Sequence, residues 1–552
     1  MSGAGLSAPG TVDEALPVDE PGTRWFTRLA GLDRPWLRWT AGYALAGVVL
    51  YVCYLWLSRT QAVLSDGASN TFEAWDMLHG NPLLRGWTLS DVSFYTTELP
   101  EYMIVELIRG LGTDVMHVAP AFTYTVLVLL AGIVAKGKAT GREAAIRIAL
   151  ASGLMLAPSL GISVRLLLGQ SDHIGTGVPL LLTFLVLDRA PRRWWVPPAV
   201  GLMLSWAVIG DRVSILVAVV PLVAVCALHT YQDRDSTDRW FTAAIGAAAV
   251  VSLGISAIVV HEITSLGGFT VLPLSTGFAS TPSLSGNFWL TVEGVLALYG
   301  ADFFGMALHL KAGFVLLHLA GVGLAAWGLG RGVRRFGRLS VLEQVLTLAI
   351  VLNIAVYLFS TMPFTAWDSR QMAVILPFGA VLAARLLSAD LLRLRLAPPL
   401  AALLGCYLLA LGYGVAQPAV AGHSQNLADW LVAHHLTGGL SAYDEGNVLT
   451  LDSGGKVRVR VVSWQPGGPV PRLYQSKASW FDPSTNYANF VVDTKVDGLP
   501  QFIPQDEIVA AFGPPAVTYQ YGPYTIMVWN KNLLAELQGP PSASPGDIGI
   551  QP

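Results

Sequence analysis

The sequence predicts a polytopic α-helical membrane protein with about 11 transmembrane helices, long outer loops and a C-terminal extracytoplasmic α/β domain. Of its 552 residues, 53% are hydrophobic and only 13% are charged, whereas an ordinary soluble domain carries roughly 25% charged residues. The apolar residues gather in runs of about 17–23, each long enough to cross the roughly 30 Å hydrocarbon core of a bilayer. The region after about residue 418 has short strand-like segments instead, which indicates a folded domain outside the membrane.

Eleven apolar runs predict the transmembrane helices. They lie at about 39–57, 119–135, 145–161, 174–188, 195–210, 213–230, 241–261, 311–329, 341–360, 370–387 and 397–417. The first run follows a long polar segment, too late for a cleaved signal peptide, so we expect a retained helix. Two of the runs, 174–188 and 195–210, are short, and their prolines can kink or bound them.

Lysine and arginine residues gather in alternate connections between the predicted spans. These basic stretches are 24–38, 136–147, 189–193, 331–338 and 385–395. The positive-inside rule makes their common side cytoplasmic. The N-terminus is then cytoplasmic. The two long connections, at about 58–118 and 262–310, lie outside together with the C-terminal region. We therefore expect a multi-pass protein of the cell membrane.

Four regions follow from this pattern. Residues 1–38 form a cytoplasmic, largely disordered N-terminal segment, because residues 1–22 are polar and rich in glycine and proline. Residues 39–417 form the transmembrane domain, and residues 418–538 form the extracytoplasmic α/β domain. Residues 539–552 form a disordered tail.

The α/β domain has recognisable local patterns. The segments NVLTL, KVRVRVVS, NFVVD and YTIMVWN predict strands, with SGG as a turn between the first two. Residues 426–436 predict an amphipathic helix, and PQDEIVAAFG predicts a short helix that begins at proline and ends at glycine. Four aromatic residues, Trp464, Tyr474, Trp480 and Tyr487, are available for carbohydrate binding or for core packing.

Charge and cysteine content exclude two kinds of protein. The net charge is −3, so there is no global basic field for nucleic acid and we expect no nucleic-acid partner. The three cysteines, Cys53, Cys226 and Cys406, lie inside apolar spans and are expected to pack there. The C-terminal domain contains no cysteine, so no disulfide framework stabilises it.

The first outer loop carries acidic residues at two places. Asp66 stands a few residues after the first span, at the start of an amphipathic helix expected at about 67–80. It is either an N-cap of that helix or a functional carboxylate, and the two roles are compatible. Glu73 and Asp76 are expected to be solvated or interfacial. Glu98 precedes a second amphipathic helix.

The three short outer connections also carry charges at the membrane boundary. They contribute Arg165, Asp172, His173, Asp211, Arg212, Asp368 and Arg370. Each has a local interpretation: Asp172 and His173 can cap a helix or bind a divalent cation, and Asp211 can pair with Arg212. Two adjacent residues supply too few ligands for a metal site by themselves. Because charges near a membrane are costly unless they are paired or hydrated, we expect these residues to converge on one site.

Several of these segments resemble the C-type (GT-C) superfamily of polytopic membrane glycosyltransferases, which includes aminoarabinose transferases and protein O-mannosyltransferases. The first-loop segment DGASNTFEAWDMLHGN resembles the family pattern in which an acidic residue precedes a helix that ends in a Met-Leu turn. Glu98-Leu99-Pro100 resembles its Glu-Lys-Pro segment, with leucine in place of lysine. Arg165 and Asp172 resemble its second-loop Arg and Asp. The Asp368-Ser369-Arg370 segment resembles its Asp-x-Arg-Tyr entry, with Gln371 where tyrosine is usual.

The resemblance covers residues 39 to about 390 and implies an activity. Such enzymes take a sugar from a polyprenyl-phosphate donor on the outer face, use the first-loop acidic residue as catalytic base, and in some cases bind a divalent cation. The expected partners are therefore that lipid-linked donor, membrane lipid, and a glycan, lipid or protein acceptor in the cell envelope. The departures at Leu99 and Gln371 bear on the acceptor and phosphate contacts.

The chemistry of such a transfer assigns roles to the residues. An attacking hydroxyl needs a base, and a positioned carboxylate supplies roughly 10²–10⁴-fold. Asp66 is the expected base and inversion the expected outcome. Asp172, the second expected catalytic residue, would orient the acceptor or help to hold a metal. Arg165, Arg212 and Arg370 are expected to neutralise the departing phosphate. Glu98, His173, Asp211 and Asp368 complete the expected substrate-binding set.

The second long outer loop is expected to cover this site. Its segment SGNFWLTVEGVLALYGADFFG is apolar enough to lie in the membrane interface. There, Trp289 and Tyr299 could bind the faces of a sugar, or the loop could guide the lipid.

Two other functions remain open on the sequence. A transporter often has two similar halves with broken helices near the midplane, but the sequence has no such repeat and its charges cluster at one face. A non-catalytic assembly protein or envelope polysaccharide-binding protein would use the C-terminal domain as its working part.

Overall fold

The computed structural model describes residues 35–170, 172–232, 239–273, 276–420, 424–465, 468–494 and 505–538. The predictions of disorder at 1–22 and 539–552 lie outside these ranges. The chain divides into two compact units, residues 1–49 and residues 50–552, and each is described by itself. The described part of the first unit belongs to helix α2 (Pro35–Ser58).

A helix occupies each of the eleven predicted spans. These helices are α2, α5 (Val115–Lys136), α6 (Gly141–Leu154), α8 (Gly177–Arg189), α9 (Val196–Gly210), η2 with α10 (Ile215–Val219 and Val220–Gln232), α11 (Arg239–Ser265), α13 (Leu310–Arg334), α14 (Val341–Phe359), α15 (Ile375–Arg393) and α16 (Ala397–Val415). Among the described residues, eight helices are long and apolar enough to cross a membrane. The chain is therefore a multi-pass membrane protein.

Three of the helices in the predicted spans are short. Helices α6, α8 and α9 have 14, 13 and 15 residues. A helix of about 14 residues is only about 21 Å long, which is shorter than the hydrocarbon core. The predicted run 145–161 continues past the end of α6, where the chain leaves the helix after Leu154. The apolar run there is longer than the helix because it also supplies buried loop residues, Met155 and Ala157 among them.

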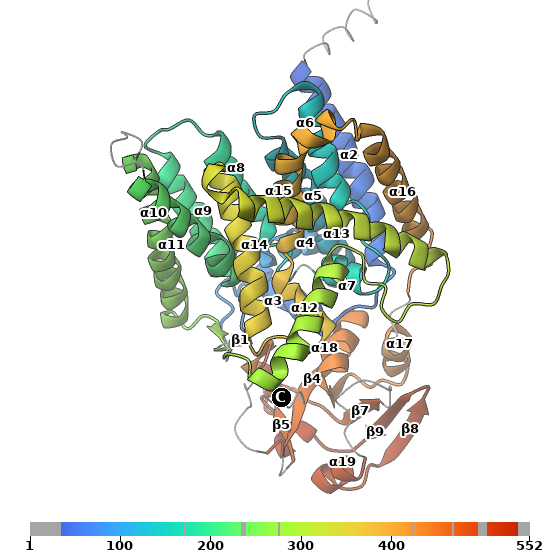
Figure 1. Ribbon diagram of the computed structural model, residues 1–552. Coiled ribbons are helices and arrows are strands. Elements are labelled where there is room, and N and C mark those ends of the chain that lie inside the picture. Colours follow the sequence, from blue (N-terminus) through green and yellow to red (C-terminus); the bar gives the residue numbers. More distant parts are fainter. Residues whose placement is uncertain are drawn as a thin grey trace, which may run out of the picture. The chain divides into compact units, whose positions relative to one another are not determined.

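Helix α15 lies at the centre of the helical bundle and packs against α5, α6, α13 and α14 (Figure 1). Its first ten residues are all buried. At its far end, Arg385 forms ion pairs with Asp188 of α8 and Glu343 of α14, at 2.9 and 3.1 Å. Helix α15 is thus fixed along its length, and so is the segment before it, the 3-10 helix η5 (Ala366–Met372).

The outer connections form a second layer with its own core. Their elements are α3 (Ser65–Leu78), β1 (Trp87–Leu89), α4 (Leu99–Arg109), α7 (Ile162–Leu168), β2 (Thr270–Val271), η3 (Thr281–Ser283) and α12 (Leu284–Leu298). Helix α3 is buried along its first ten residues apart from Asp66. Gly67 allows this burial, because a Cβ atom there would overlap the side chain of Met116.

The predicted environment of Glu73 is wrong, whereas Asp76 is partly exposed and paired. Glu73 is 1% exposed, so it is neither solvated nor interfacial. Asp76 accepts hydrogen bonds from the Trp87 indole at 2.7 Å and from Lys477 at 3.0 Å. The amphipathic pattern of the helix predicted a solvated face, but the C-terminal domain covers that face instead.

The C-terminal domain is an α/β fold. Its elements are α17 (Gln425–Ala433), β3 (Gly438–Ser441), α18 (Tyr443–Asp452), β4 (Arg458–Gln465), β5 (Gly468–Pro471), β6 (Ser476–Lys477), η6 (Ala478–Phe481), β7 (Phe490–Thr494), α19 (Gln505–Phe512), β8 (Val517–Tyr521), β9 (Tyr524–Val528) and η7 (Leu533–Glu536). Six strands form a sheet in the order β5-β4-β3-β7-β9-β8. Strand β3 is parallel to β4 and β7, and the remaining pairs are antiparallel.

The prediction of a strand at NVLTL is wrong, since this segment lies in helix α18. A short apolar run fits a buried helix as well as a strand. The strand that precedes it is β3, whose sequence GGLS carries no strand signal. Its glycines are required because a Cβ atom at Gly438 or Gly439 would overlap the backbone of Tyr487 or the ring of Phe490. The other predicted strands and both predicted helices are present.

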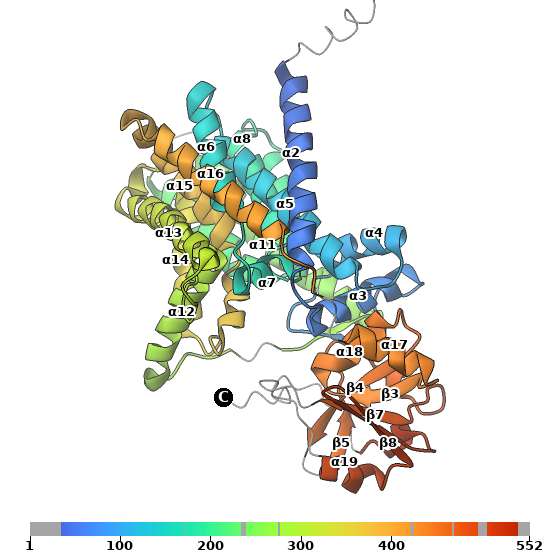
Figure 2. The same ribbon diagram turned by 90° about the vertical axis from the view of Figure 1, so that its right-hand side faces the viewer.

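The C-terminal domain is joined to the outer layer by a small sheet. Strand β6 pairs with β1 of the first outer loop, and β1 pairs with β2 of the second. Trp480 packs edge-on against Trp87, with 4.9 Å between ring centroids. Helix α18 packs against α3, and Figure 2 shows α17 and α18 between the six-stranded sheet and the outer helices. These contacts bring the start of α18 to Asp66.

Candidate functional site

Asp66 is at the centre of a group of charged side chains contributed by distant parts of the chain. Its Oδ2 accepts a hydrogen bond from Nη1 of Arg370 at 2.7 Å, and its Oδ1 accepts one from the Tyr443 hydroxyl at 2.6 Å. The helix is not capped by this side chain, because the N-cap position is Leu64 and has no side-chain capping bond. Burial acts to raise the pKa of Asp66, but Arg370, Tyr443 and Arg472 outweigh it and lower that pKa. Asp66 is therefore ionised at neutral pH.

Asp172 lies on the other side of Arg370. Its Oδ2 is 3.9 Å from Nη1 of Arg370, and its two oxygens accept hydrogen bonds from Asn70 at 3.0 Å and Gln170 at 2.7 Å. Burial, followed by the nearby charge of Asp66, raises the pKa of Asp172 to about 7. Arg370 thus stands between two carboxylates of different acidity.

The C-terminal domain contributes one wall of the site. Tyr443, the first residue of α18, donates a hydrogen bond from its hydroxyl to Asp66, and the same hydroxyl contacts the side-chain carbonyl of Gln475. The guanidinium of Arg472 lies over the rings of Tyr443 and Tyr474, at 4.3 and 5.2 Å from their centroids. Arg472 is 3% exposed, and its Nε and Nη2 have no hydrogen-bond partner within the described ranges. A buried cation with free donors is suited to an anion that enters beside it.

Arg165 and Arg370 share one aromatic side chain. Their guanidinium groups lie 4.9 and 5.2 Å from the ring centroid of Trp367. Arg165 is exposed on α7. Burial lowers the pKa of Arg165, while Asp444 and Asp66 oppose that effect. Three arginines, Arg165, Arg370 and Arg472, therefore lie near enough to Asp66 to interact with its charge.

His173 and Asp211 form a buried pair behind this group. His173 Nδ1 lies 2.8 Å from Asp211 Oδ2, and their side chains are 5% and 1% exposed. Asp211 also accepts a hydrogen bond from Thr176. His173 has a φ of 58°, the left-handed region that costs non-glycine residues about 1–2 kcal/mol. Gln475 has a φ of 49°, so two residues around the site hold this unfavourable conformation.

Glu98 is fully buried next to that pair. Burial raises its pKa well above the ordinary value, with Thr97 opposing and Asp211 and Asp172 adding to the effect. Gly175 leaves room for the carboxyl group, because a Cβ atom there would be 2.6 Å from Glu98 Oε1. Glu98 is therefore packed below the site surface.

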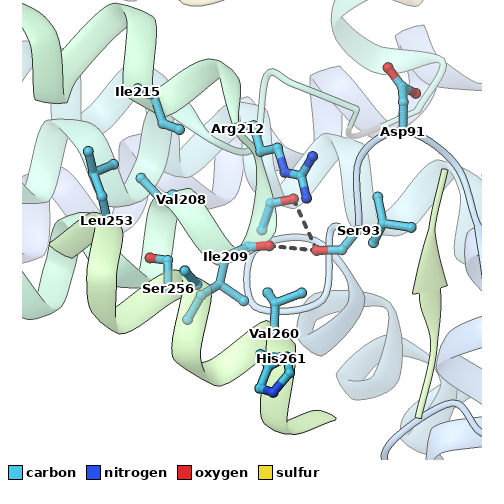
Figure 3. A pocket seen from close by; sticks show the side chains of 13 residues that line it. Asp91, Ser93, Val208, Ile209, Arg212, Ile215, Leu253, Ser256, Val260 and His261 are labelled. Atoms are coloured by element: carbon cyan, nitrogen blue, oxygen red, sulfur yellow. Dashed lines mark hydrogen bonds between the residues drawn. The ribbon is translucent and has the colours of Figure 1, made fainter. Parts of the chain in front are cut away.

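Two further predicted residues lie apart from Asp66. Asp368 Oδ2 accepts the backbone N–H of Thr365 at 2.7 Å and its hydroxyl at 3.0 Å, so it caps η5. Arg212 lines a cavity of about 450 Å³ between α9 and α11 (Figure 3). Its walls are mostly apolar, with Asp91 and His261 as further polar residues. Within the described part of the chain, no hydrogen bond or ion pair joins Arg212 to the Asp66 group.

The aromatic residues predicted to bind sugar have different environments. Tyr299 is 5% exposed and its hydroxyl donates to the carbonyl of Ile375 at 3.2 Å, so it is a core residue and the predicted sugar contact is wrong. Trp289 is 61% exposed. Trp464 and Trp480 pack in the domain interior or at its junction, and Tyr487 is 56% exposed.

The sequence interpretation missed the residues that the C-terminal domain contributes, chiefly Tyr443, Arg472 and Gln475. A signal for Tyr443 exists: it follows β3 directly, at the carboxyl end of a strand that is parallel to both neighbours. Open α/β sheets bind ligands at such ends. The signal was lost because β3 itself was not predicted.

Nothing among the described residues forms a group of three or more His, Cys, Asp or Glu side chains that could hold a metal ion. The carboxylates of Asp66 and Asp172 both face Arg370. Arg370 thus provides the positive charge between them.

No protein-family model matches the chain, and no curated protein matches it in sequence. Several solved structures match the chain in fold. ArnT from Cupriavidus metallidurans, in the apo state, has a TM-score of 0.51 and 12% identity over 91% of this chain and 99% of that chain. The Archaeoglobus fulgidus oligosaccharyltransferase, tethered with an acceptor peptide, has a TM-score of 0.46 and 12% identity over 84% and 70% of the two chains. The likeness to ArnT confirms the predicted GT-C fold.

Proposed function

We propose that this GT-C protein is a membrane glycosyltransferase that moves a sugar from a polyprenyl-phosphate donor to a cell-envelope acceptor on the outer face. The observation that carries the proposal is the environment of Asp66. The ionised Asp66 carboxylate accepts hydrogen bonds from Arg370 and Tyr443. Arg472 lowers the pKa of Asp66 further, and Arg165 lies over the same tryptophan ring as Arg370. This is the arrangement that base-assisted displacement of a phosphate requires.

Asp66 acts as the base in this proposal. An acceptor hydroxyl has a high pKa and needs a base at the moment of attack. The Asp66 carboxylate has about four lone-pair positions, and Arg370 and Tyr443 occupy two of them. A hydroxyl can therefore approach the remaining positions without breaking either contact.

The arginines stabilise the leaving group. Arg370 and Arg165 lie over Trp367, and Arg472 has free donors next to Tyr443. Preorganised donors of this kind contribute about 10²–10³-fold each in enzymes that stabilise an oxyanion. Because Arg472 belongs to the C-terminal domain, the domain is part of the catalytic site in this proposal.

The step is a single displacement. The acceptor oxygen attacks the anomeric carbon, its proton passes to Asp66, and the bond between that carbon and the phosphate oxygen breaks. Polyprenyl phosphate leaves with the electron pair of the broken bond. Attack from the face opposite the phosphate inverts the anomeric centre. Asp172 also attracts the Arg370 guanidinium and thereby positions it.

An exposed apolar surface supports a lipid-linked donor. Helix α12 packs against η5, which carries Arg370. Phe288 and Trp289 of α12 are 50% and 61% exposed, and Phe278 and Leu308 of the same outer loop are 94% and 95% exposed. Large apolar side chains at such exposure are typical of a membrane or lipid contact. The chain of the donor can lie there with its phosphate at the arginines.

Transfer by the purified protein tests the proposal. The protein is incubated with radiolabelled polyprenyl-phosphate sugars and an envelope extract, and labelled product and released polyprenyl phosphate are measured together. We expect equal amounts of both, with the opposite anomeric configuration in the product. Retained configuration would reject the single displacement. Release of neither product across a panel of donors would favour the transporter or the polysaccharide-binding protein.

A further inference from the structure

A polar cavity lies on the C-terminal domain, away from Asp66. It has a volume of about 470 Å³. Its residues come from the amino-terminal ends of the three parallel strands: Thr437 precedes β3, Lys456 and Arg458 stand at the start of β4, and Tyr487 precedes β7. Tyr443 is at the carboxyl end of β3, so the two sites lie at opposite ends of that strand.

Three cations line this cavity and no carboxylate does. They are Lys456, Arg458 and Arg460. Arg460 is only 8% exposed, and its guanidinium lies 4.4 Å from the ring centroid of Trp480. Within the described ranges, the guanidinium group of Arg460 has neither a hydrogen bond nor an ion pair. Burial, together with the charge of Arg458, lowers the pKa of Arg460 to about 9. An uncompensated buried cation is costly, and an anion in the cavity would remove that cost.

The remaining lining residues favour a saccharide over a lipid surface. Tyr487 is 56% exposed, so its ring can stack on a pyranose face, as aromatic rings with a polar tip do at interfaces. Thr437 and Thr485 supply hydroxyl groups. A membrane-binding surface instead needs exposed apolar side chains, and the large apolar residue here, Leu534, is 4% exposed.

We propose that this cavity binds an anionic saccharide unit, one that carries a carboxylate or a phosphate. Arg460 and Arg458 pair with the anionic group, and Tyr487 stacks on the sugar ring. As a subsite for the acceptor, it rests on the proposed transferase function and gives that acceptor an acidic character. As a binding site, it stands independently of catalysis.

Direct binding to the full-length protein in nanodiscs tests the inference. The probes are an oligogalacturonate, a phosphorylated oligomannoside, the neutral counterpart of each, and vesicles that contain phosphatidylglycerol. Titration calorimetry gives the affinities. We expect at least one anionic oligosaccharide to bind at least tenfold more tightly than its neutral counterpart, with an affinity that falls as salt is raised. Equal affinity for charged and neutral sugars, or binding to the vesicles alone, would overturn the proposal.

Variants locate the binding. Arg460→Gln and Tyr487→Ala should each weaken the anionic oligosaccharide at least tenfold. Lys531→Gln is the matched control, because it removes the same charge from the same domain but from a lysine already paired with Glu536. Tyr487 is exposed, so its variant keeps the test valid if Arg460→Gln unfolds. Full affinity in the Tyr487→Ala protein, or equal loss in the Lys531→Gln protein, would reject the site. Asp66→Asn should bind normally, which separates failure of this inference from failure of the transferase proposal.

Discussion

At the scale of single residues, the position of Arg370 between Asp66 and Asp172 decides how both carboxylates behave. Its Nη1 is 2.7 Å from Asp66 and 3.9 Å from Asp172. The closer carboxylate has a lowered pKa and the more distant one a raised pKa. Two carboxylates in one site with separated pKa values can take different roles: one stays ionised while the other titrates near neutral pH.

This difference predicts a pH dependence that belongs to Asp172. Its pKa is about 7, so its ionised fraction rises about tenfold between pH 6 and pH 8. Ionised Asp172 holds Arg370 more firmly, and we expect kcat/KM for sugar transfer to rise through this window. The Asp172→Asn variant should lack the rise, as measured by pH profiles of both proteins. An unchanged profile in the variant would assign the titration to another group.

Glu98 predicts a pH dependence of stability. Burial raises its pKa, so the folded protein holds this proton more tightly than the unfolded chain. The associated stability is complete below the ordinary glutamate pKa of about 4.3 and is lost as pH rises toward the folded value. We therefore expect Glu98→Gln to stabilise the protein at pH 8, by about 1–3 kcal/mol for a buried group relieved of its charge. The effect should vanish near pH 4. Melting curves in detergent at both pH values check this, and a destabilised variant at pH 8 would contradict it.

At the scale of elements, neighbouring residues serve different purposes because of the geometry of the segment that carries them. Asp368 caps η5 while Arg370 reaches Asp66. Residues in a 3-10 helix are about 120° apart around its axis, so two residues at i and i+2 face different sides. A sequence pattern that groups charges by proximity cannot separate them. Asp211 and Arg212 also have different surroundings, since Asp211 pairs with His173 and Arg212 lines the cavity between α9 and α11.

Helix α18 brings Tyr443 to the site, and its hydroxyl lowers the pKa of Asp66. A hydrogen bond to a charged group is worth about 1.5–3 kcal/mol. We therefore expect Tyr443→Phe to reduce kcat about 10- to 100-fold and to move the lower part of the acid limb of the pH profile, the part that belongs to Asp66, to higher pH. Tyr519→Phe is the matched control, because Tyr519 belongs to β8, the edge strand of the same sheet that is farthest from β5. A lowered kcat with an unmoved acid limb would restrict Tyr443 to a structural role.

Much of the fold could be predicted at this scale, and the reason is physical. Long apolar runs have few alternatives to membrane helices, and charges at the membrane boundary must find partners. The convergence of Asp66, Asp172 and Arg370 follows from that constraint. Strand β3 and Arg472 could not be predicted in this way. A glycine-rich buried strand has no hydrophobic period, and the approach of Arg472 to Asp66 depends on how the C-terminal domain meets the first loop.

At the scale of the whole molecule, the account requires the C-terminal domain and the outer loops to lie on one side of the membrane. The basic residues between the spans predict, under the positive-inside rule, that the other connections lie in the cytoplasm. The contacts of β6 with β1 and of α18 with α3 join the domain to the first outer loop. These contacts require only that the C-terminal domain and the first outer loop lie on the same side of the membrane. The positive-inside rule predicts which side that is.

Labelling of intact cells tests the orientation. With the three native cysteines replaced by alanine, single cysteines are introduced by Val517→Cys in the C-terminal domain and Arg193→Cys in a basic connection. Both positions are exposed. We expect a membrane-impermeant maleimide to label the first variant in intact cells and the second only after permeabilisation. The reverse pattern would invert the topology and place Asp66 on the cytoplasmic side.

The most direct test of the central claim is sugar transfer from polyprenyl-phosphate donors by Asp66→Asn compared with Asp368→Asn, at matched expression and melting temperature. Both changes convert an outer-face carboxylate to an amide, but Asp368 caps η5 and Asp66 is the proposed base. We expect Asp66→Asn to lower kcat at least about 10²-fold, the lower bound for a lost general base, while Asp368→Asn retains most of the activity. Equal transfer by wild type and Asp66→Asn would contradict it.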